Sequence, residues 1–137
     1  MLKQNNNLKH LEGVSKMKSQ TTNNEKTWDE LARNGVLCSQ PKLALTPEEA
    51  KRYINKNGFY KDSLHGKNVL CLAAGGGQQS IGFALLGATV TVVDFSEEQL
   101  KKDKLVADQY QKSIRVVKAD MRDLSFCRDK ELSLIHI

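Results

Sequence analysis

The chain has 137 residues, a formal net charge of +5, 39% hydrophobic and 27% charged residues, which is typical of a globular protein with room for one domain. Its three cysteines, Cys38, Cys71 and Cys127, are too few and too scattered for a disulfide scaffold or a zinc cluster. No stretch approaches the roughly 18 apolar residues of a membrane span, and the polar N-terminus is no secretory signal. We therefore expect a cytoplasmic protein with no membrane partner.

The excess of positive charge lies mostly at the N-terminus. Residues 1–26 contain five lysines and two glutamates, whereas the other 111 residues carry a net charge of only +2. A nucleic-acid surface gathers basic residues on one face and often interleaves aromatic side chains. We therefore expect no nucleic-acid partner. Residues 1–26, rich in asparagine, threonine and lysine, are expected to be a flexible polar tail.

Residues 27–65 are predicted to form N-terminal cap helices. Thr27 is expected to begin a short helix, because its hydroxyl can accept a hydrogen bond from a free backbone N–H. Thr46 is expected to begin a second helix, in which Glu49 completes a capping box. Gly58 suits the left-handed position after the end of that helix.

Residues 66–131 alternate between strand and helix patterns. Short apolar runs predict three strands, at residues 69–73, 89–93 and 114–119. Helical spacing of apolar residues predicts a helix at 81–88, and a capping box predicts the start of another at 96–111. Successive strands joined by helices form parallel sheets with right-handed crossovers. The predicted fold is an α/β, doubly wound sheet, truncated after the third strand, with N-terminal helices.

Glycines and carboxylates follow the predicted strands. Gly75-Gly76-Gly77 follows the first strand, Asp94 ends the second and Asp120 follows the third. Glycines let a backbone pass close to a ligand, and a carboxylate at the place of Asp94 can bind both hydroxyls of a ribose. A glycine triplet alone is more typical of a tight turn, but the three features in register favour an adenosine-containing ligand.

The glycine loop narrows the choice of ligand. Ser80 stands where a dinucleotide-binding fingerprint has its third glycine, and the lysine of a Walker-type loop is missing. No lysine or arginine lies between Lys67 and Lys101, so nothing cationic is placed for a pyrophosphate. A ligand whose ribose carries no phosphate fits better, which points to S-adenosylmethionine.

Three segments resemble the motifs of the class I S-adenosylmethionine-dependent methyltransferases, which have a Rossmann-like fold. Residues 69–77 (VLCLAAGGG) are similar to the first motif, 92–96 (VVDFS) to the second and 118–121 (KADM) to the third. The resemblance covers roughly residues 66–125 and implies S-adenosyl-L-methionine as the cofactor.

The resemblance also implies roles for individual residues. The backbone of the glycine loop would hold the methionine end of the cofactor, and Asp94 would bind its ribose. Phe95 would pack on the adenine, whose edge Asp120 and the Met121 backbone would read. The cofactor-binding residues that it implies are Ala73, Gly75, Gly77, Gln78, Asp94, Phe95, Asp120 and Met121.

Two positions depart from the family pattern. Cys71 stands where the family usually has an acidic residue, and Ala73 where it usually has a glycine. Cys71 lacks the carboxylate that helps to order the loop, whereas Ala73 adds only a methyl group. We do not expect Cys71 to be a nucleophile, because apolar burial in a strand raises the pKa of a thiol.

Residues 132–137 (LSLIHI) look like the translation of a transposase adapter used to build sequencing libraries. We expect them to be an artefact, and we expect the other flank of the first strand to be open. In the family that the motifs resemble, the residues that position the methyl acceptor mostly follow the fourth strand. No catalytic residue is therefore assigned, and the 137-residue chain by itself is expected to be inactive.

The sequence thus predicts the cofactor-binding part of a methyltransferase that acts on a small-molecule acceptor, with no metal ion and an undetermined oligomeric state. Two alternatives stay open at this point. One is an NAD(P)-dependent oxidoreductase with a similar first half, and the other is a non-catalytic nucleotide-binding module.

Overall fold

Four parallel strands form the centre of the fold. The computed structural model describes residues 2–128 and 131–137, and the side chains of these residues except 2–15, 17 and 38. The strand order is β3-β2-β1-β4, and each neighbouring pair is parallel. The strands are β1 (Asn68–Leu72), β2 (Thr89–Asp94), β3 (Ile114–Lys118) and β4 (Leu134–His136). The predicted α/β class and the three predicted strands are confirmed.

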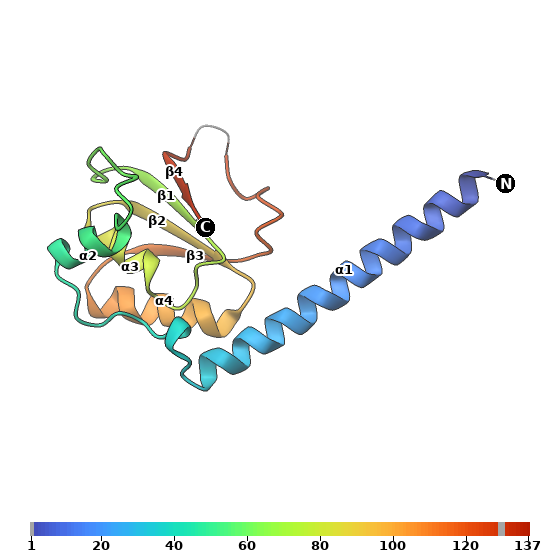
Figure 1. Ribbon diagram of the computed structural model, residues 1–137, viewed down its shortest axis with the longest axis horizontal. Coiled ribbons are helices and arrows are strands. Elements are labelled where there is room, and N and C mark those ends of the chain that lie inside the picture. Colours follow the sequence, from blue (N-terminus) through green and yellow to red (C-terminus); the bar gives the residue numbers. More distant parts are fainter. Residues whose placement is uncertain (1, 129–130) are drawn as a thin grey trace.

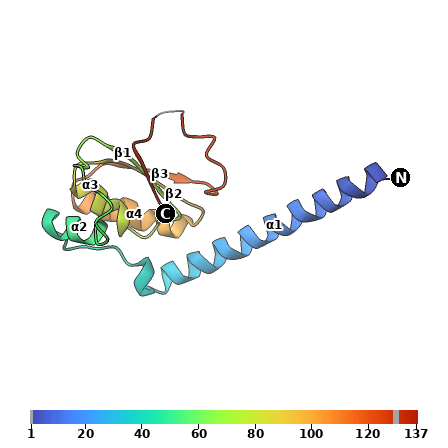
Figure 2. The same cartoon turned by 45° about the horizontal axis from the view of Figure 1, so that its top comes forward.

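Three helices cover one face of the sheet, and a fourth extends away from it. Figures 1 and 2 show α2 (Pro47–Ile54), α3 (Gln79–Leu85) and α4 (Glu97–Gln109) on the same side of the strands. The long helix α1 (Leu2–Arg33) meets the rest of the molecule near its C-terminal end and is followed by a short 3-10 helix, η1 (Leu37–Ser39). Residues 119–128, which follow β3, pack on the opposite face of the sheet. Figure 2 shows this segment beyond the strands.

Alternate residues of β1 enter two separate cores. Val69 and Cys71 face the helices and pack with the buried side chains of α3 and α4. Leu70 and Leu72 face the other side, where Val93 and the segment between β3 and β4 cover them. A parallel strand that is buried on both faces requires a continuous apolar run. This requirement is why the strand could be recognised in the sequence.

The N-terminal segment differs from the prediction. Instead of a flexible tail followed by a helix that begins at Thr27, one helix runs through residues 2–33. Thr27 lies inside this helix, where its hydroxyl donates to the carbonyl of Asn23 at 3.0 Å. The lysines, glutamines and leucines of the segment favour a helix although few of its residues are apolar. A polar composition was therefore a poor guide to local structure here, and the boundary predicted between 26 and 27 lies within α1.

The two predicted capping boxes have different outcomes. At α2 the box is complete, because the Thr46 hydroxyl accepts from the Glu49 N–H and the Glu49 carboxylate accepts from the Thr46 N–H. At α4 only half of the box forms: the Ser96 hydroxyl accepts from the Gln99 N–H at 3.2 Å. The Ser96 N–H binds Asp94 instead, and Gln99 Oε1 is buried with no hydrogen-bond partner among the described residues.

A fourth strand corrects the prediction of a sheet truncated after its third strand. Leu134–His136 pairs in parallel with β1, opposite residues 69–71. The Ser133 N–H also donates to the Asn68 carbonyl at 2.9 Å. The prediction of an open flank on β1 is wrong, because this short apolar segment satisfies the hydrogen-bonding groups of the strand edge. The adapter origin of residues 132–137 stays a prediction, which the nucleotide record tests.

Candidate functional site

A cavity of about 300 Å³ lies where the carboxyl ends of β1, β2 and β3 meet α1. This is the edge at which doubly wound sheets bind their ligands. The residues that line it are Gln20, Thr21, Asn24, Ala73, Val93, Asp94, Phe95, Ala119, Asp120, Met121 and Arg122. Five of the eight residues predicted to bind the cofactor are therefore brought together: Ala73, Asp94, Phe95, Asp120 and Met121.

Asp94 ends β2 and joins the glycine loop to the start of α4. Its Oδ2 accepts a hydrogen bond from the Gly75 N–H at 3.1 Å, and its Oδ1 accepts from the Ser96 N–H at 2.9 Å. Burial raises the pKa of Asp94 above its usual value, and the N–H donors of Ser96 and Gly75 oppose that rise. Each carboxylate oxygen can accept a further hydrogen bond. Asp94 can therefore hold the loop and still bind a hydroxyl group in the cavity.

The glycine loop is packed too closely for side chains. Gly76 and Gly77 have φ angles of +106° and +75°. A Cβ at Gly75 would lie 2.5 Å from the Cβ of Gln99, and one at Gly77 would lie 2.6 Å from Cγ1 of Val106. Both neighbours belong to α4, so the loop rests directly on that helix. Gly75 and Gly77 thus shape the loop, and they lie behind the cavity rather than in its lining.

Ala73 has a φ of +48°, which is rare for a residue with a side chain. Its N–H donates to the Val93 carbonyl at 2.8 Å, which holds the backbone in this conformation. Glycine adopts such a φ angle without steric cost. This φ angle gives a physical reason why the methyltransferase motif that residues 69–77 resemble usually has glycine at this position. Ala73 lies in the wall of the cavity.

Gln78 is not among the residues that line the cavity. Its side-chain amide donates to the carbonyls of Leu37 at 3.1 Å and Gln40 at 2.9 Å. The Tyr53 hydroxyl donates to Gln78 Oε1 at 3.4 Å. Gln78 therefore connects the η1 segment and α2 to the start of α3, and its role in cofactor binding stays a prediction.

Asp120 is held by Arg122 at the end of β3. Asp120 Oδ1 accepts from the Arg122 backbone N–H at 3.0 Å and from Arg122 Nε at 2.8 Å, and Oδ2 accepts from Nη2. These contacts lower the pKa of Asp120 to about 2. Arg122 Nη2 also donates to the Thr21 hydroxyl at 2.9 Å. An ionised carboxylate and a guanidinium thus stand side by side in the cavity wall.

One expectation about chemistry can be compared with the structure. Cys71 is buried in β1, and burial together with Asp103 raises the pKa of its thiol to about 12, so it is no nucleophile, as expected. Among the side chains that the structure describes within residues 2–128 and 131–137, no cluster of His, Cys, Asp and Glu is arranged to hold a metal ion. In the same ranges, no helix has the length and apolar character needed to cross a membrane.

Comparison with known proteins identifies the family. The family model of the methyltransferase domain matches residues 69–137, about half of the chain. The chain belongs to this methyltransferase family. It is 35% identical over 128 residues to the uncharacterized methyltransferase YbaJ of Bacillus subtilis (strain 168). That match covers 87% of this chain but only 50% of YbaJ, so the chain spans half the length of this relative.

Solved structures share the fold of this methyltransferase domain. The PH0226 protein of Pyrococcus horikoshii OT3 superposes with a TM-score of 0.52 at 24% identity, over 66% of this chain and 43% of that one. The mmp1179 protein of Methanococcus maripaludis, described as a candidate S-adenosyl-L-methionine-dependent methyltransferase, gives 0.51 at 22% identity, over 81% and 47%. At these identities the likeness concerns the fold alone.

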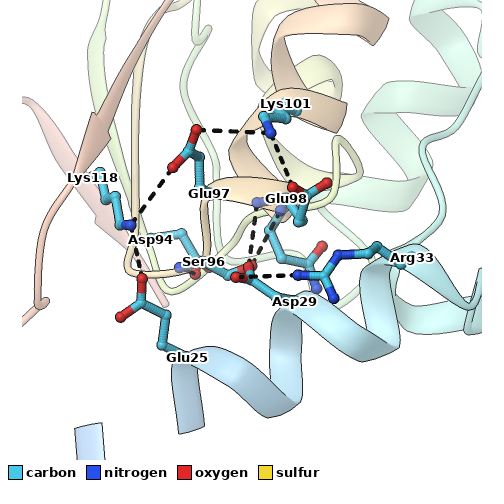
Figure 3. A network of polar contacts seen from close by, with 10 residues as sticks. Glu25, Asp29, Arg33, Asp94, Ser96, Glu97, Glu98, Lys101 and Lys118 are labelled. Carbon is cyan, nitrogen blue, oxygen red and sulfur yellow. Dashed lines mark hydrogen bonds and ion pairs between the residues drawn. The ribbon is translucent and has the colours of Figure 1, made fainter. Parts of the chain in front are cut away.

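Helix α1 supplies a wall of the methyltransferase cavity that the sequence did not indicate. Gln20, Thr21 and Asn24 line the cavity opposite the strand ends. Glu25 pairs with Lys118 at the end of β3, with 2.7 Å between Oε1 and Nζ (Figure 3). These residues fall in the segment predicted to be a tail, and no local pattern marks them as part of a site.

Helices α1 and α4 cap each other's ends. Asp29 Oδ1 accepts from the Ser96 hydroxyl at 2.6 Å and from the Glu98 N–H at 3.3 Å, at the positive N-terminus of α4 (Figure 3). Conversely, Lys102 Nζ donates to the Ala32 carbonyl at 2.5 Å, at the negative C-terminus of α1. Because Ser96 also binds Asp94, these contacts connect α1 to the cavity wall.

Proposed function

We propose that the chain binds S-adenosyl-L-methionine in this cavity, as the cofactor-binding part of a methyltransferase that acts on a small-molecule acceptor. One observation carries the proposal. Asp94 and Asp120, at the ends of two adjacent strands, line a single cavity together with Phe95 and Met121. Membership of the methyltransferase domain family supports the same activity.

The residues present fit such a cofactor. Ionised carboxylates accept hydrogen bonds from hydroxyl and amino groups, which the ribose and the adenine offer. Aromatic and thioether side chains such as Phe95 and Met121 cover flat aromatic surface favourably. The donor and acceptor pattern therefore suits an adenosine with no phosphate.

Each part of the site would have a separate task. Asp94 would accept hydrogen bonds from the ribose hydroxyls, and Asp120 with the Met121 backbone would bind the adenine edge. The backbone near Ala73 would approach the methionine end. When bound, the cofactor supplies a sulfonium methyl group for in-line transfer to a nucleophile. The described residues would bind and orient it, while the residues that position the acceptor stay unassigned.

The activity of the chain alone and its location are part of the same proposal. Because the chain spans half the length of YbaJ, we propose that these 137 residues bind the cofactor but do not transfer the methyl group by themselves. We also propose a reducing, cytoplasmic location, since Cys71 and Cys127 are free thiols. The small-molecule acceptor is supported by the low net charge of +2 outside residues 1–26.

Binding of S-adenosylhomocysteine by the full-length protein tests the proposal. Calorimetry should show binding of S-adenosylhomocysteine, the product that the cofactor becomes after methyl transfer, and no binding of NAD. Asp94→Ala should weaken it about ten- to hundred-fold, since hydrogen bonds to a charged group contribute about 1.5–3 kcal/mol. Asp108→Ala, at an exposed position of α4, is the matched control and should bind normally.

Three results would contradict the proposal. Binding of NAD without S-adenosylhomocysteine would favour an oxidoreductase. Binding that Asp94→Ala leaves unchanged would favour a module that uses another surface. If the folded full-length protein bound neither compound, S-adenosyl-L-methionine would be excluded as its cofactor.

A further inference from the structure

Asp103 is a buried carboxylate for which the proposed function gives no role. It lies in the middle of α4 and is fully buried. Its Oδ2 accepts a hydrogen bond from the Gly76 N–H at 2.7 Å, and its Oδ1 accepts from the Ser80 hydroxyl. Burying an ionised carboxylate is costly unless donors surround it. Here the donors come from the glycine loop and the first turn of α3.

A whole face of α4 supports the glycine loop. Gln99, Asp103 and Val106 follow one another at helical spacing, so their side chains lie on one face. A Cβ at Gly76 would lie 2.9 Å from Gln99 Oε1, and one at Gly77 would lie 2.6 Å from Val106 Cγ1. Asp103 is the charged member in the middle of this face. The Gly76 N–H donates both to the Asp103 carboxylate at 2.7 Å and to the Gln99 carbonyl at 3.2 Å, whereas Val106 only limits the available space.

Cys71 lies beside Asp103 but cannot support the loop in the same way. It stands in β1, four positions before Gly75, and is fully buried. Burial and the neighbouring Asp103 keep the Cys71 thiol neutral by raising its pKa to about 12. A thiol is only a weak acceptor for backbone N–H groups. The strand therefore offers the loop no strong acceptor at this position, and Asp103 offers one from the other side.

We propose that Asp103 is a positioning residue, which holds the glycine loop from α4 in the shape that binds the cofactor. The inference rests on the proposed function. Asp103 is absent from the cavity lining and acts through the Gly76 backbone. Its loss should therefore change affinity for the cofactor without removing any direct contact with it.

The charge of Asp103 opposes folding while it orders the loop. Burial raises its pKa from 3.8 to about 7, against the donors Ser80, Gly76 and Gly77, and repulsion from Asp94 adds to the rise. Because this pKa is raised on folding, the folded chain holds the proton more tightly than the unfolded chain. The contribution of Asp103 to stability therefore falls as the pH rises from about 4 to about 7. A neutral asparagine of the same shape removes this penalty.

Asp103→Asn in the full-length protein tests the proposal. At pH 8, calorimetry with S-adenosylhomocysteine should show affinity about ten-fold weaker, equivalent to about 1.4 kcal/mol. The melting temperature should be unchanged or higher, and the Gly76 amide should exchange its hydrogen faster. Asp108→Asn on the same helix is exposed and should change none of the three quantities.

The outcomes separate the two proposals. A folded wild type that binds no S-adenosylhomocysteine refutes the proposed function. A wild type that binds it only as tightly as Asp103→Asn does overturns the positioning role alone. If affinity and melting temperature fall together, or if Asp103→Asn does not fold while Asp108→Asn does, Asp103 is a structural residue and the inference is wrong.

Discussion

The two sides of the cavity are built in different ways. On the inner side, the glycine loop rests on α4 through buried contacts, among them the Asp103 carboxylate on the Gly76 N–H. On the outer side, α1 is held by contacts at helix ends and by ion pairs with partly exposed side chains, such as Glu25 with Lys118 (Figure 3). The glycine loop reaches the cavity through Asp94, which binds the Gly75 N–H, whereas α1 lines the cavity directly.

The difference indicates that the inner wall, the glycine loop on α4, is held rigidly, whereas the outer wall, α1, can detach from the rest of the molecule. Contacts between exposed charges contribute little and are screened by salt, whereas buried hydrogen-bonded groups are costly to disturb. The glycine loop should therefore keep its shape under conditions in which α1 detaches. Substitutions in each wall test this contrast, from the largest expected effect to the smallest.

Gly77→Ala, in the inner wall, should lower the free energy of unfolding more than the other substitutions. The new Cβ would lie 2.6 Å from Val106 Cγ1 and 3.1 Å from the Pro41 Cβ, in a residue whose φ is +75°. Overpacking and a left-handed backbone together should lower the free energy of unfolding by about 3 kcal/mol. Denaturant unfolding of the full-length protein measures this loss.

Gly58→Ala is the matched control for that substitution. Gly58 has a similar φ of +69°, but a Cβ there would meet nothing within 4 Å. Only the backbone penalty of about 1 kcal/mol should appear. Equal losses for the two variants would contradict the close packing of the loop on α4.

Asp29→Ala should loosen the outer wall. The substitution removes the acceptor for the Ser96 hydroxyl and the Glu98 N–H at the start of α4, and loss of such a cap costs about 1 kcal/mol. Hydrogen exchange should increase in α1 residues 20–33 while the glycine loop stays protected. Glu30→Ala, the exposed neighbour, is the control, and faster exchange in the loop would show that the two walls are not separable.

Lys118→Ala should have the smallest effect. Lys118 pairs with Glu25 at 2.7 Å and with Glu97 at 3.7 Å, but its side chain is about half exposed. The loss should be a few tenths of a kcal/mol and should vanish in about 1 M salt. Lys104→Ala, an exposed lysine of α4, provides the baseline, and a loss that persists in high salt would mean that the outer wall is not held by exposed charges.

The candidate site was predictable where local rules apply. Asp94 and Asp120 follow apolar strands, and the ends of parallel strands meet at one edge, so their meeting in one cavity followed from the pattern. Gln78 shows the limit of predicting a contact from neighbouring residues in the sequence. Its place beside the glycines suggested a contact with the cofactor, but the carbonyls of Leu37 and Gln40, about 40 positions earlier, engage its amide.

The sequence by itself determined three of the four strands, the cap of α2 and the carboxylates at the strand ends, because each depends on residues a few positions apart. The tertiary structure alone decided how the loop is supported and what closes the cavity. Asp103 meets Gly76 across 27 positions, and Asp29 meets Ser96 across 67. Such contacts depend on how helices pack, which no short pattern of residue types encodes. Packing against the rest of the molecule also places part of a polar segment that was expected to be a tail, Gln20, Thr21 and Asn24, in the wall of the cavity.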